Sequence, residues 1–277
     1  MKIGIICAPG VGDALILHIA SHQLKLAGFE VVTETPHSFG RWLSGYRFGE
    51  TSACEALFLQ HDNSLKANQI QSLSCPVYTF YGSYHLLKHP PLRKGLDFVC
   101  DLNRTMVENV VASLEALFSI RATPDNGFRP PPELTHRKHK KRVVIHATSG
   151  HPARNWPERK FLKVARWLEG EGYEPSFLPL FPSLEQLSSY LYESGFFLGN
   201  DSGPGHLASL LEIPYLIIGR QERHMRHWRP GWGKGAIIVP PKWVPNWKGL
   251  RLRDHKWKTF ITSKNVINTL ERSVLNN

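Results

Sequence analysis

The sequence of 277 residues has no apolar run near the ~20 residues that a membrane-spanning helix requires. The apolar part of residues 1–10 is also too short for a signal peptide, so we expect a first strand there that runs into a glycine turn. No internal repeat is present. With 42% hydrophobic and 11% aromatic residues, the chain is expected to be globular rather than disordered.

Cysteines are few, and none has the spacing of a metal site or a redox motif. Cys7, Cys54, Cys75 and Cys100 lie within or beside apolar stretches of the first 100 residues, without C-x-x-C spacing. No H-E-x-x-H motif is present. The pattern predicts buried free thiols in a reducing, cytoplasmic environment and no bound metal.

The net charge of +11 is concentrated in one segment, residues 220–258. That segment holds 11 Lys and Arg against Glu222 and Asp254, together with five of the eight tryptophans. Basic residues interleaved with Trp suit a phosphorylated partner, an anionic membrane surface or nucleic acid. The alternative is a solvated basic face whose tryptophans pack inward.

Apolar runs and helical patterns alternate in βα fashion on either side of a proline-rich break at residues 123–132, which is the best interdomain linker candidate. We therefore predict an α/β fold of GT-B-like type: two Rossmann-like βαβ domains, residues 1–130 and 131–277, facing across a cleft. The predicted strands are 2–7, 29–33, 56–59, 77–80, 142–146, 175–180 and 215–218, and the predicted helices are 14–27, 106–118, 157–169, 184–193 and 262–274.

The most informative stretch is residues 196–211, which reads as a buried strand, a tight turn and a helix. The turn holds Asp201, Ser202, Gly203, Gly205 and His206. Free N–H groups at a helix start attract anions, and glycines let a phosphate approach the main chain, so the turn predicts a phosphate or sugar-nucleotide site. The alternatives are an ordinary βα turn with Asp or Ser as N-cap, and a hydrogen-bonded helix histidine at His206.

Two further loops follow predicted first strands. Gly10-Val11-Gly12 lacks the third glycine of a dinucleotide fingerprint, and Asp13 would repel a pyrophosphate, so an NAD site is disfavoured. Asp13 is instead placed to accept a proton from a bound hydroxyl, unless it only caps its helix. In residues 147–157, Thr148, Ser149 and Arg154 suit a pyrophosphate, unless this is a solvent loop anchored by Trp156.

These segments, in this order, resemble glycosyltransferase family 9, the bacterial heptosyltransferases of the lipopolysaccharide inner core. The resemblance rests on Gly12-Asp13, on residues 146–149 with 154–157, and on residues 199–206. It implies an inverting, metal-independent transferase without a cofactor that moves a sugar, typically heptose from ADP-heptose, onto a lipid-linked or phosphorylated saccharide.

The resemblance also implies a role for each matching residue. Asp13 would be the catalytic base, and Thr148, Ser149 and Arg154 would hold the donor diphosphate. Asp201, Ser202, Gly203 and His206 would contact the donor sugar and phosphates. Residues 1–130 would bind the acceptor and 131–277 the donor, with the last helix packing back on the first domain.

The sequence departs from the family in three places. Residues 178–182 replace a longer unit that usually carries an acid for the nucleotide ribose, Arg154 replaces a lysine, and Gly205 replaces a larger residue. We expect contact of residues 220–258 with the anionic inner membrane and no nucleic-acid partner. Two alternatives stay open: a non-catalytic nucleotide-sugar or phosphate binder of the same fold, and a nucleic-acid binder.

Overall fold

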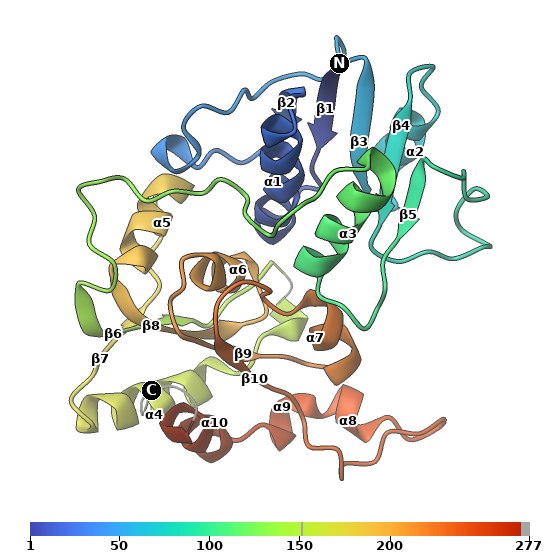
Figure 1. The fold of residues 1–277 in the computed structure, drawn as a ribbon. Helices are drawn as coiled ribbons and strands as arrows, with labels where there is room; N and C mark the ends of the chain where they lie inside the picture. Colours follow the sequence, from blue (N-terminus) through green and yellow to red (C-terminus); the bar gives the residue numbers. More distant parts are fainter. Residues whose placement is uncertain (151, 273–277) are drawn as a thin grey trace. The chain divides into compact units, whose positions relative to one another are not determined.

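A computed structural model describes residues 1–150 and 152–272 of the chain. The chain divides into two compact units, Met1–Pro131 (unit 1) and Pro132–Asn277 (unit 2), which are described separately (Figure 1). Among the described residues, no helix is both long and apolar enough to cross a bilayer.

Unit 1 is a five-stranded parallel sheet in the order β2-β1-β3-β4-β5, with helices on it (Figure 1). The inner strands are buried and read as continuous apolar runs, as parallel strands covered on both faces do. The elements are β1 Lys2–Ile6, α1 Val11–Leu26, β2 Glu30–Glu34, η1 Gly40–Leu43, β3 Ala56–His61, α2 Leu65–Gln71, β4 Val77–Tyr81, β5 Asp97–Val99 and α3 Met106–Phe118.

The first half of the predicted linker is not a free connection, because residues 123–129 pack on unit 1. Gln23 Nε2 of α1 donates to the Asp125 carbonyl (2.9 Å), and Asn126 Nδ2 donates to the Leu15 carbonyl (3.0 Å). Phe128 stacks on buried Trp42 with ring centroids 4.9 Å apart. Proline content indicated the break in regular structure, but Asn126 and Phe128 belong to the fold of unit 1.

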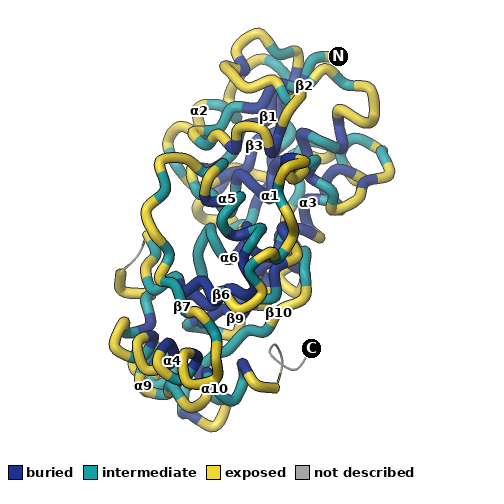
Figure 2. The backbone as a smooth tube through the Cα atoms, turned by 90° about the vertical axis from the view of Figure 1, so that its left-hand side faces the viewer, coloured by how far each residue is buried: buried dark blue, intermediate teal, exposed yellow. Residues whose placement is uncertain are grey.

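Unit 2 repeats the architecture with a parallel sheet in the order β10-β9-β8-β6-β7. The central strands of each sheet are largely buried (dark blue in Figure 2): β1, β3 and β4 in unit 1, and β8 and β9 in unit 2. The elements are β6 His139–His146, η2 Pro152–Arg154, α4 Glu158–Gly170, β7 Glu174–Phe177, α5 Leu184–Tyr192, β8 Ser194–Asn200, α6 Gly203–Leu210, β9 Tyr215–Ile218, α7 Glu222–Trp228, β10 Gly235–Ile238, α8 Leu252–His255, α9 Trp257–Phe260 and α10 Ser263–Leu270.

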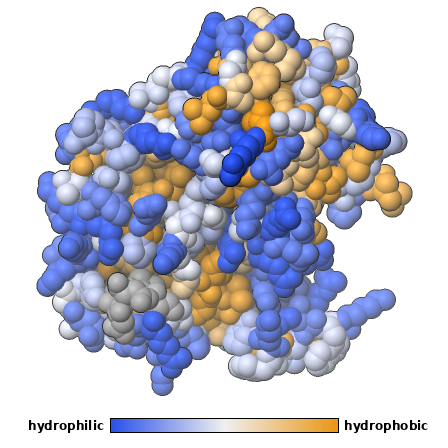
Figure 3. Space-filling model, in the orientation of Figure 1, coloured by the Kyte–Doolittle hydropathy of each residue, from blue (hydrophilic) through white to orange (hydrophobic). Residues whose placement is uncertain are grey.

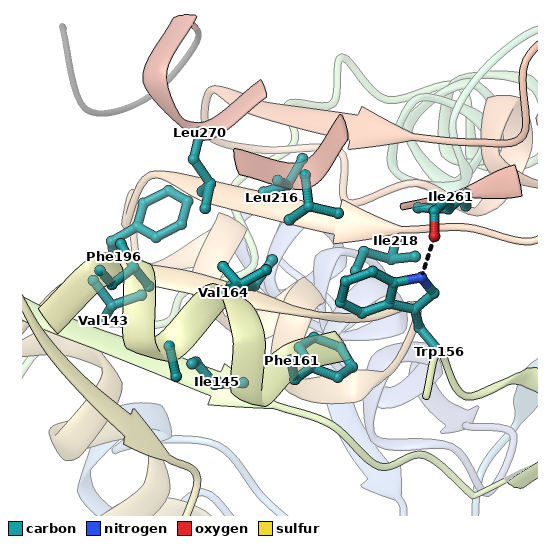
Figure 4. Close-up of a cluster of buried hydrophobic side chains, with 14 of the residues drawn as sticks. Val143, Ile145, Trp156, Phe161, Val164, Phe196, Leu216, Ile218, Ile261 and Leu270 are labelled. Carbon is teal, nitrogen blue, oxygen red and sulfur yellow. Dashed lines mark hydrogen bonds between the residues drawn. The ribbon is translucent and has the colours of Figure 1, made fainter. Parts of the chain in front are cut away.

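The hydrophobic core of unit 2 lies between its sheet and the helices α4 and α10 (Figure 4). Phe161 and Val164 of α4 share one buried cluster with Leu216 of β9 and Leu270 of α10. Trp156 is also fully buried, and its indole Nε1 donates to the Ile261 carbonyl at 2.9 Å. The last helix thus packs on its own unit, and its predicted return to the first domain stays a prediction.

Most predicted elements are present, with shifted ends. The helix 106–118 and the strand 215–218 match α3 and β9 residue for residue. The strand expected at 175–180 ends at Phe177, and the helix expected at 262–274 is described as Ser263–Leu270, with residue 274 outside the described residues. All four cysteines are free, as predicted, but only Cys100 is buried, while the other three are half-buried.

Candidate functional site

The carboxyl edge of the unit 1 sheet presents the carboxylate of Asp13. Asp13 lies in the first turn of α1, and one of its oxygens, Oδ1, accepts a hydrogen bond from Gln60 Nε2 at the end of β3 (2.6 Å). A Cβ atom built on Gly10 would lie 2.3 Å from the other oxygen, Oδ2, so a larger residue at position 10 would require the Asp13 side chain to move. The positive end of the helix dipole also stabilises a carboxylate at this position.

The N-cap of α1 is Gly10, and Asp13 is the third residue of the helix, so Asp13 is not the N-cap residue itself. The role of Asp13 as a base stays a prediction. Sequence reasoning missed Gln60 and the close approach of Gly10 to the Asp13 carboxylate. Gln60 could have been found from its place at the end of a strand that pairs with β1, since carboxyl ends of parallel strands share one edge.

A cavity of about 510 Å³ opens at the same edge of unit 1, lined by residues that include Gln60, Cys7 and Asp62. Glu34 in its wall pairs with Lys66 at 2.9 Å. Burial raises the pKa of Glu34, but hydrogen bonds from Lys66 and Thr51 outweigh burial, so the net shift is downward and the carboxylate stays ionised. Burial, with Asp13 and Glu34 nearby, raises the pKa of Cys7, so its thiol stays protonated. The cavity offers charged and polar groups beside Asp13.

In unit 2 a histidine joins the two predicted phosphate loops. His146, at the end of β6, has Nδ1 2.9 Å from Ser202 Oγ and Nε2 3.3 Å from Thr148 Oγ1. Because Ser202 Oγ donates to the Asn200 carbonyl (3.1 Å), we assign the imidazole proton to Nδ1. Burial lowers the pKa of His146 to about 4, so the ring is neutral near pH 7.

Asn200, the last residue of β8, fixes the loop that follows β6. Its Nδ2 donates to the Ala147 carbonyl (2.7 Å), and its Oδ1 accepts from the Trp156 backbone N–H (2.8 Å). Within the loop, Ser149 Oγ donates to Asn155 Oδ1 (2.5 Å). Buried Trp156 therefore anchors the loop as one interpretation expected, while Thr148 and Arg154 stay exposed.

The remaining predicted residues lie around the start of α6. Ser202 is the N-cap but makes no side-chain cap hydrogen bond, and Gly203 is the first helical residue. Asp201 Oδ2 is 3.1 Å from His224 Nε2 of α7, whereas His206 is buried inside α6. The structure thus joins Thr148 and Ser202 through His146, and it places Asp201 with His224 instead. His146 and Asn200 lie within the segments 146–149 and 199–206 that carry the resemblance but were assigned no role there, and His224 was missed.

The basic segment of unit 2 encloses a cavity of about 660 Å³. Its cationic lining is Arg220, Arg223, Arg226, Lys248, Arg251 and Arg253, against the acids Glu222 and Asp254. Arg220 Nε is buried and has no hydrogen-bond partner among the described residues. Of the five tryptophans, Trp257 is buried, whereas Trp243 and Trp247 are 76% and 61% exposed, so inward packing holds for only part of the segment.

No group of three or more His, Cys, Asp and Glu side chains that could hold a metal ion exists within residues 1–150 and 152–272. Independence of the reaction from metal ions stays a prediction, as does the absence of a cofactor.

Two parallel α/β sheets in one chain, each with polar groups at its carboxyl edge, form a GT-B-like fold. Among solved structures, the chain is similar to the E. coli heptosyltransferase WaaC with ADP (12% identity, TM-score 0.67, covering 99% of this chain and 100% of that one). It is also similar to E. coli ADP-heptose lipopolysaccharide heptosyltransferase II (15% identity, TM-score 0.67, covering 100% of this chain and 99% of that one).

A third similar structure is a family 9 glycosyltransferase from Veillonella parvula (13% identity, TM-score 0.67, covering 100% of this chain and 98% of that one). These similarities confirm, at the level of fold, the resemblance to the family 9 heptosyltransferases, over the length of the chain. No protein-family model and no curated protein sequence matches the chain significantly. The predicted cleft between the units stays a prediction.

Proposed function

We propose that this protein is an inverting glycosyltransferase that transfers a sugar from an ADP-sugar, with ADP-heptose as the first candidate, to a lipopolysaccharide core-type acceptor. The observation that carries the proposal is Asp13 at the start of α1, whose carboxylate is held by Gln60, a residue that also lines the cavity of unit 1. The fold shared with heptosyltransferases supports it.

In this proposal unit 1 supplies the base. Asp13 accepts the proton of an acceptor hydroxyl, and the hydroxyl oxygen attacks the anomeric carbon of the donor from the face opposite the leaving group. A new glycosidic C–O bond forms as the bond to the nucleoside diphosphate breaks, so the configuration inverts. A positioned base contributes roughly 10²–10⁴-fold to such a rate.

Unit 2 supplies the donor site. Thr148, Ser149 and Arg154 bind the diphosphate, and the N-terminus of α6 at Ser202 and Gly203 adds backbone N–H groups. Asp201 and His206 contact the donor sugar and phosphates. Fixed donors that stabilise charge on the departing diphosphate act electrostatically, and neutral His146 orients the hydroxyls of Thr148 and Ser202.

The basic cavity of unit 2 gives residues 220–258 a separate role in the proposal. Its arginines would bind phosphate groups of the acceptor or anionic lipid, and the exposed Trp243 and Trp247 suit a membrane interface. The protein would then act in the cytoplasm at the inner membrane face.

The test is transfer from ADP-heptose to a lipopolysaccharide acceptor that lacks heptose, with the anomeric configuration of the product determined by NMR. A product of inverted configuration supports the proposal. Binding of ADP-sugar without transfer to any such acceptor would favour the non-catalytic nucleotide-sugar binder.

A further inference from the structure

Two adjacent leucines project from the loop between β4 and β5 of unit 1. Leu86 is 83% exposed and Leu87 is 101% exposed. In Figure 3 hydrophobic atoms protrude at the right-hand side of the unit, where Figure 1 draws this loop. Single exposed leucines are ordinary, but two neighbours fully presented to solvent at one turn indicate a surface that meets an apolar partner.

The turn that carries these leucines is held in place by hydrogen bonds and a stacked pair of rings. Buried His89 accepts a hydrogen bond at Nδ1 from the His85 backbone N–H (2.9 Å) and bonds through Nε2 to Asn63 Oδ1. Tyr84 stacks on the His89 ring (centroids 5.3 Å apart) and donates its hydroxyl proton to the Pro90 carbonyl (2.9 Å). The fold therefore holds the turn in place while its two leucines face solvent.

The charged residues within the segment 82–96 all have one sign. Residues 82–96 contain Lys88, Arg93 and Lys94 and no Asp or Glu. Arg93 is engaged within the unit by Asp97 (2.7 Å), whereas Lys88 and Lys94 are exposed. Apolar side chains flanked by lysines match the boundary of an anionic bilayer, where acyl chains lie beneath negative headgroups.

The turn is tied to the cavity beside Asp13. Asn63, which holds His89, lies between Asp62 and Ser64, and both of these line the cavity of about 510 Å³. A membrane contact made by this turn would bring that cavity next to the lipid surface.

We propose that Leu86 and Leu87 insert into an anionic lipid bilayer, with Lys88 and Lys94 at the headgroups. The contact presents the unit 1 cavity to an acceptor anchored in the same membrane, and this consequence rests on the proposed function. The contact is peripheral and belongs to unit 1, so it is distinct from the basic segment of unit 2.

The test is co-sedimentation of the full chain with vesicles of phosphatidylcholine alone and of phosphatidylcholine mixed with phosphatidylglycerol. The wild type is expected to bind the mixed vesicles more tightly. Replacing both leucines (Leu86→Ser with Leu87→Ser) is expected to weaken binding by about 10-fold for each leucine lost from the apolar phase. Both side chains are exposed, so the fold should be unchanged by circular dichroism.

The matched control is Leu26→Ser, because Leu26 is also exposed (68%) but ends α1 at the amino edge of the same sheet. It should bind vesicles like the wild type. Unchanged binding by the double leucine variant, together with loss in a Trp243→Ser and Trp247→Ser variant, would overturn the proposal. Stabilisation by ADP is measured in the same variants, since its absence would refute the proposed function without touching the membrane contact.

Discussion

The two units share one topology but carry different chemistry. In each, the first strand lies between the second and third, and an amide at the end of the third strand fixes the segment that comes after the first strand. Gln60 of β3 holds the Asp13 side chain, whereas Asn200 of β8 holds the main chain at Ala147 and Trp156. One scaffold thus positions an acid in unit 1 and an exposed loop in unit 2.

The charge differs as sharply as the chemistry. Residues 1–131 contain 11 Lys and Arg and 11 Asp and Glu, whereas residues 132–277 contain 23 and 12, so the whole net charge of +11 lies in unit 2. A unit without net charge that positions the Asp13 carboxylate suits a catalytic base, and a basic unit suits the binding of an anionic donor. The difference teaches that a shared topology sets where the groups lie, while the loop residues decide the chemistry.

The largest expected effect separates catalysis from donor binding. Asp13→Asn keeps the shape of the side chain but removes the base, so turnover should fall roughly 10²–10⁴-fold while affinity for the donor stays unchanged. Arg154→Ala, by contrast, should weaken the affinity for the donor. Steady-state kinetics and calorimetry measure the two effects. Equal loss of donor affinity in both variants would contradict the claim that unit 1 supplies the base and unit 2 binds the donor.

Stability should respond separately in the two units. Phe128→Ala removes the ring that stacks on Trp42, and Trp156→Ala removes a buried indole with its hydrogen bond to Ile261. Each should lower the free energy of unfolding by about 3–5 kcal/mol. Hydrogen exchange should show increased opening of unit 1 in the first variant and of unit 2 in the second. The opposite pattern would show that residues 123–129 do not stabilise unit 1.

Acid should destabilise unit 1 through His18. The ring is fully buried among Phe39, Tyr46 and Phe48, neither nitrogen has a hydrogen-bond partner among the described residues, and burial lowers the pKa of His18 to about 4. A depressed histidine pKa means that the unfolded chain binds more protons between pH 4 and 6.5. Stability is therefore complete above pH 6.5 and falls by up to about 3 kcal/mol as pH drops toward 4.

His18→Leu should remove that dependence in unit 1 and raise its stability at pH 5, as measured by hydrogen exchange across a pH series. The matched control is His146→Leu, whose effect should appear in unit 2 because His146 also has a pKa of about 4. An acid transition in unit 1 that keeps its full size in His18→Leu would contradict this assignment.

The smallest expected effects come from the paired amides. Gln60→Ala removes the hydrogen bond to Asp13, and a bond to a charged group contributes about 1.5–3 kcal/mol, so kcat should fall roughly 10-fold with little change in donor affinity. Asn200→Ala releases the loop after β6, so it should weaken donor affinity instead. Measurement of KM and kcat for both variants separates the two roles. The same changes in KM and kcat in both variants would refute the assignment of Gln60 to the base and Asn200 to the donor site.

Much of this arrangement could be predicted from the sequence, because strand and helix patterns and the loops at 147–157 and 199–206 are local signals. β5 and β10 were missed since they are edge strands of three and four residues with weak apolar patterns. His224 contacts Asp201, 23 residues away, and His146 contacts Ser202, 56 residues away, and a single sequence does not reveal such pairs. The packing of Phe128 on Trp42 was missed for the same reason.

The central claim is that this chain binds an ADP-sugar, and a thermal-shift screen of ADP, UDP, GDP, CMP and their sugar conjugates tests it most directly. We expect selective stabilisation by ADP and ADP-heptose that rises with ligand concentration, by about 2.7 kcal/mol at a hundredfold excess over Kd. The shift should be preserved in Asp13→Asn and reduced in Arg154→Ala. The absence of any nucleotide-dependent shift would contradict the account.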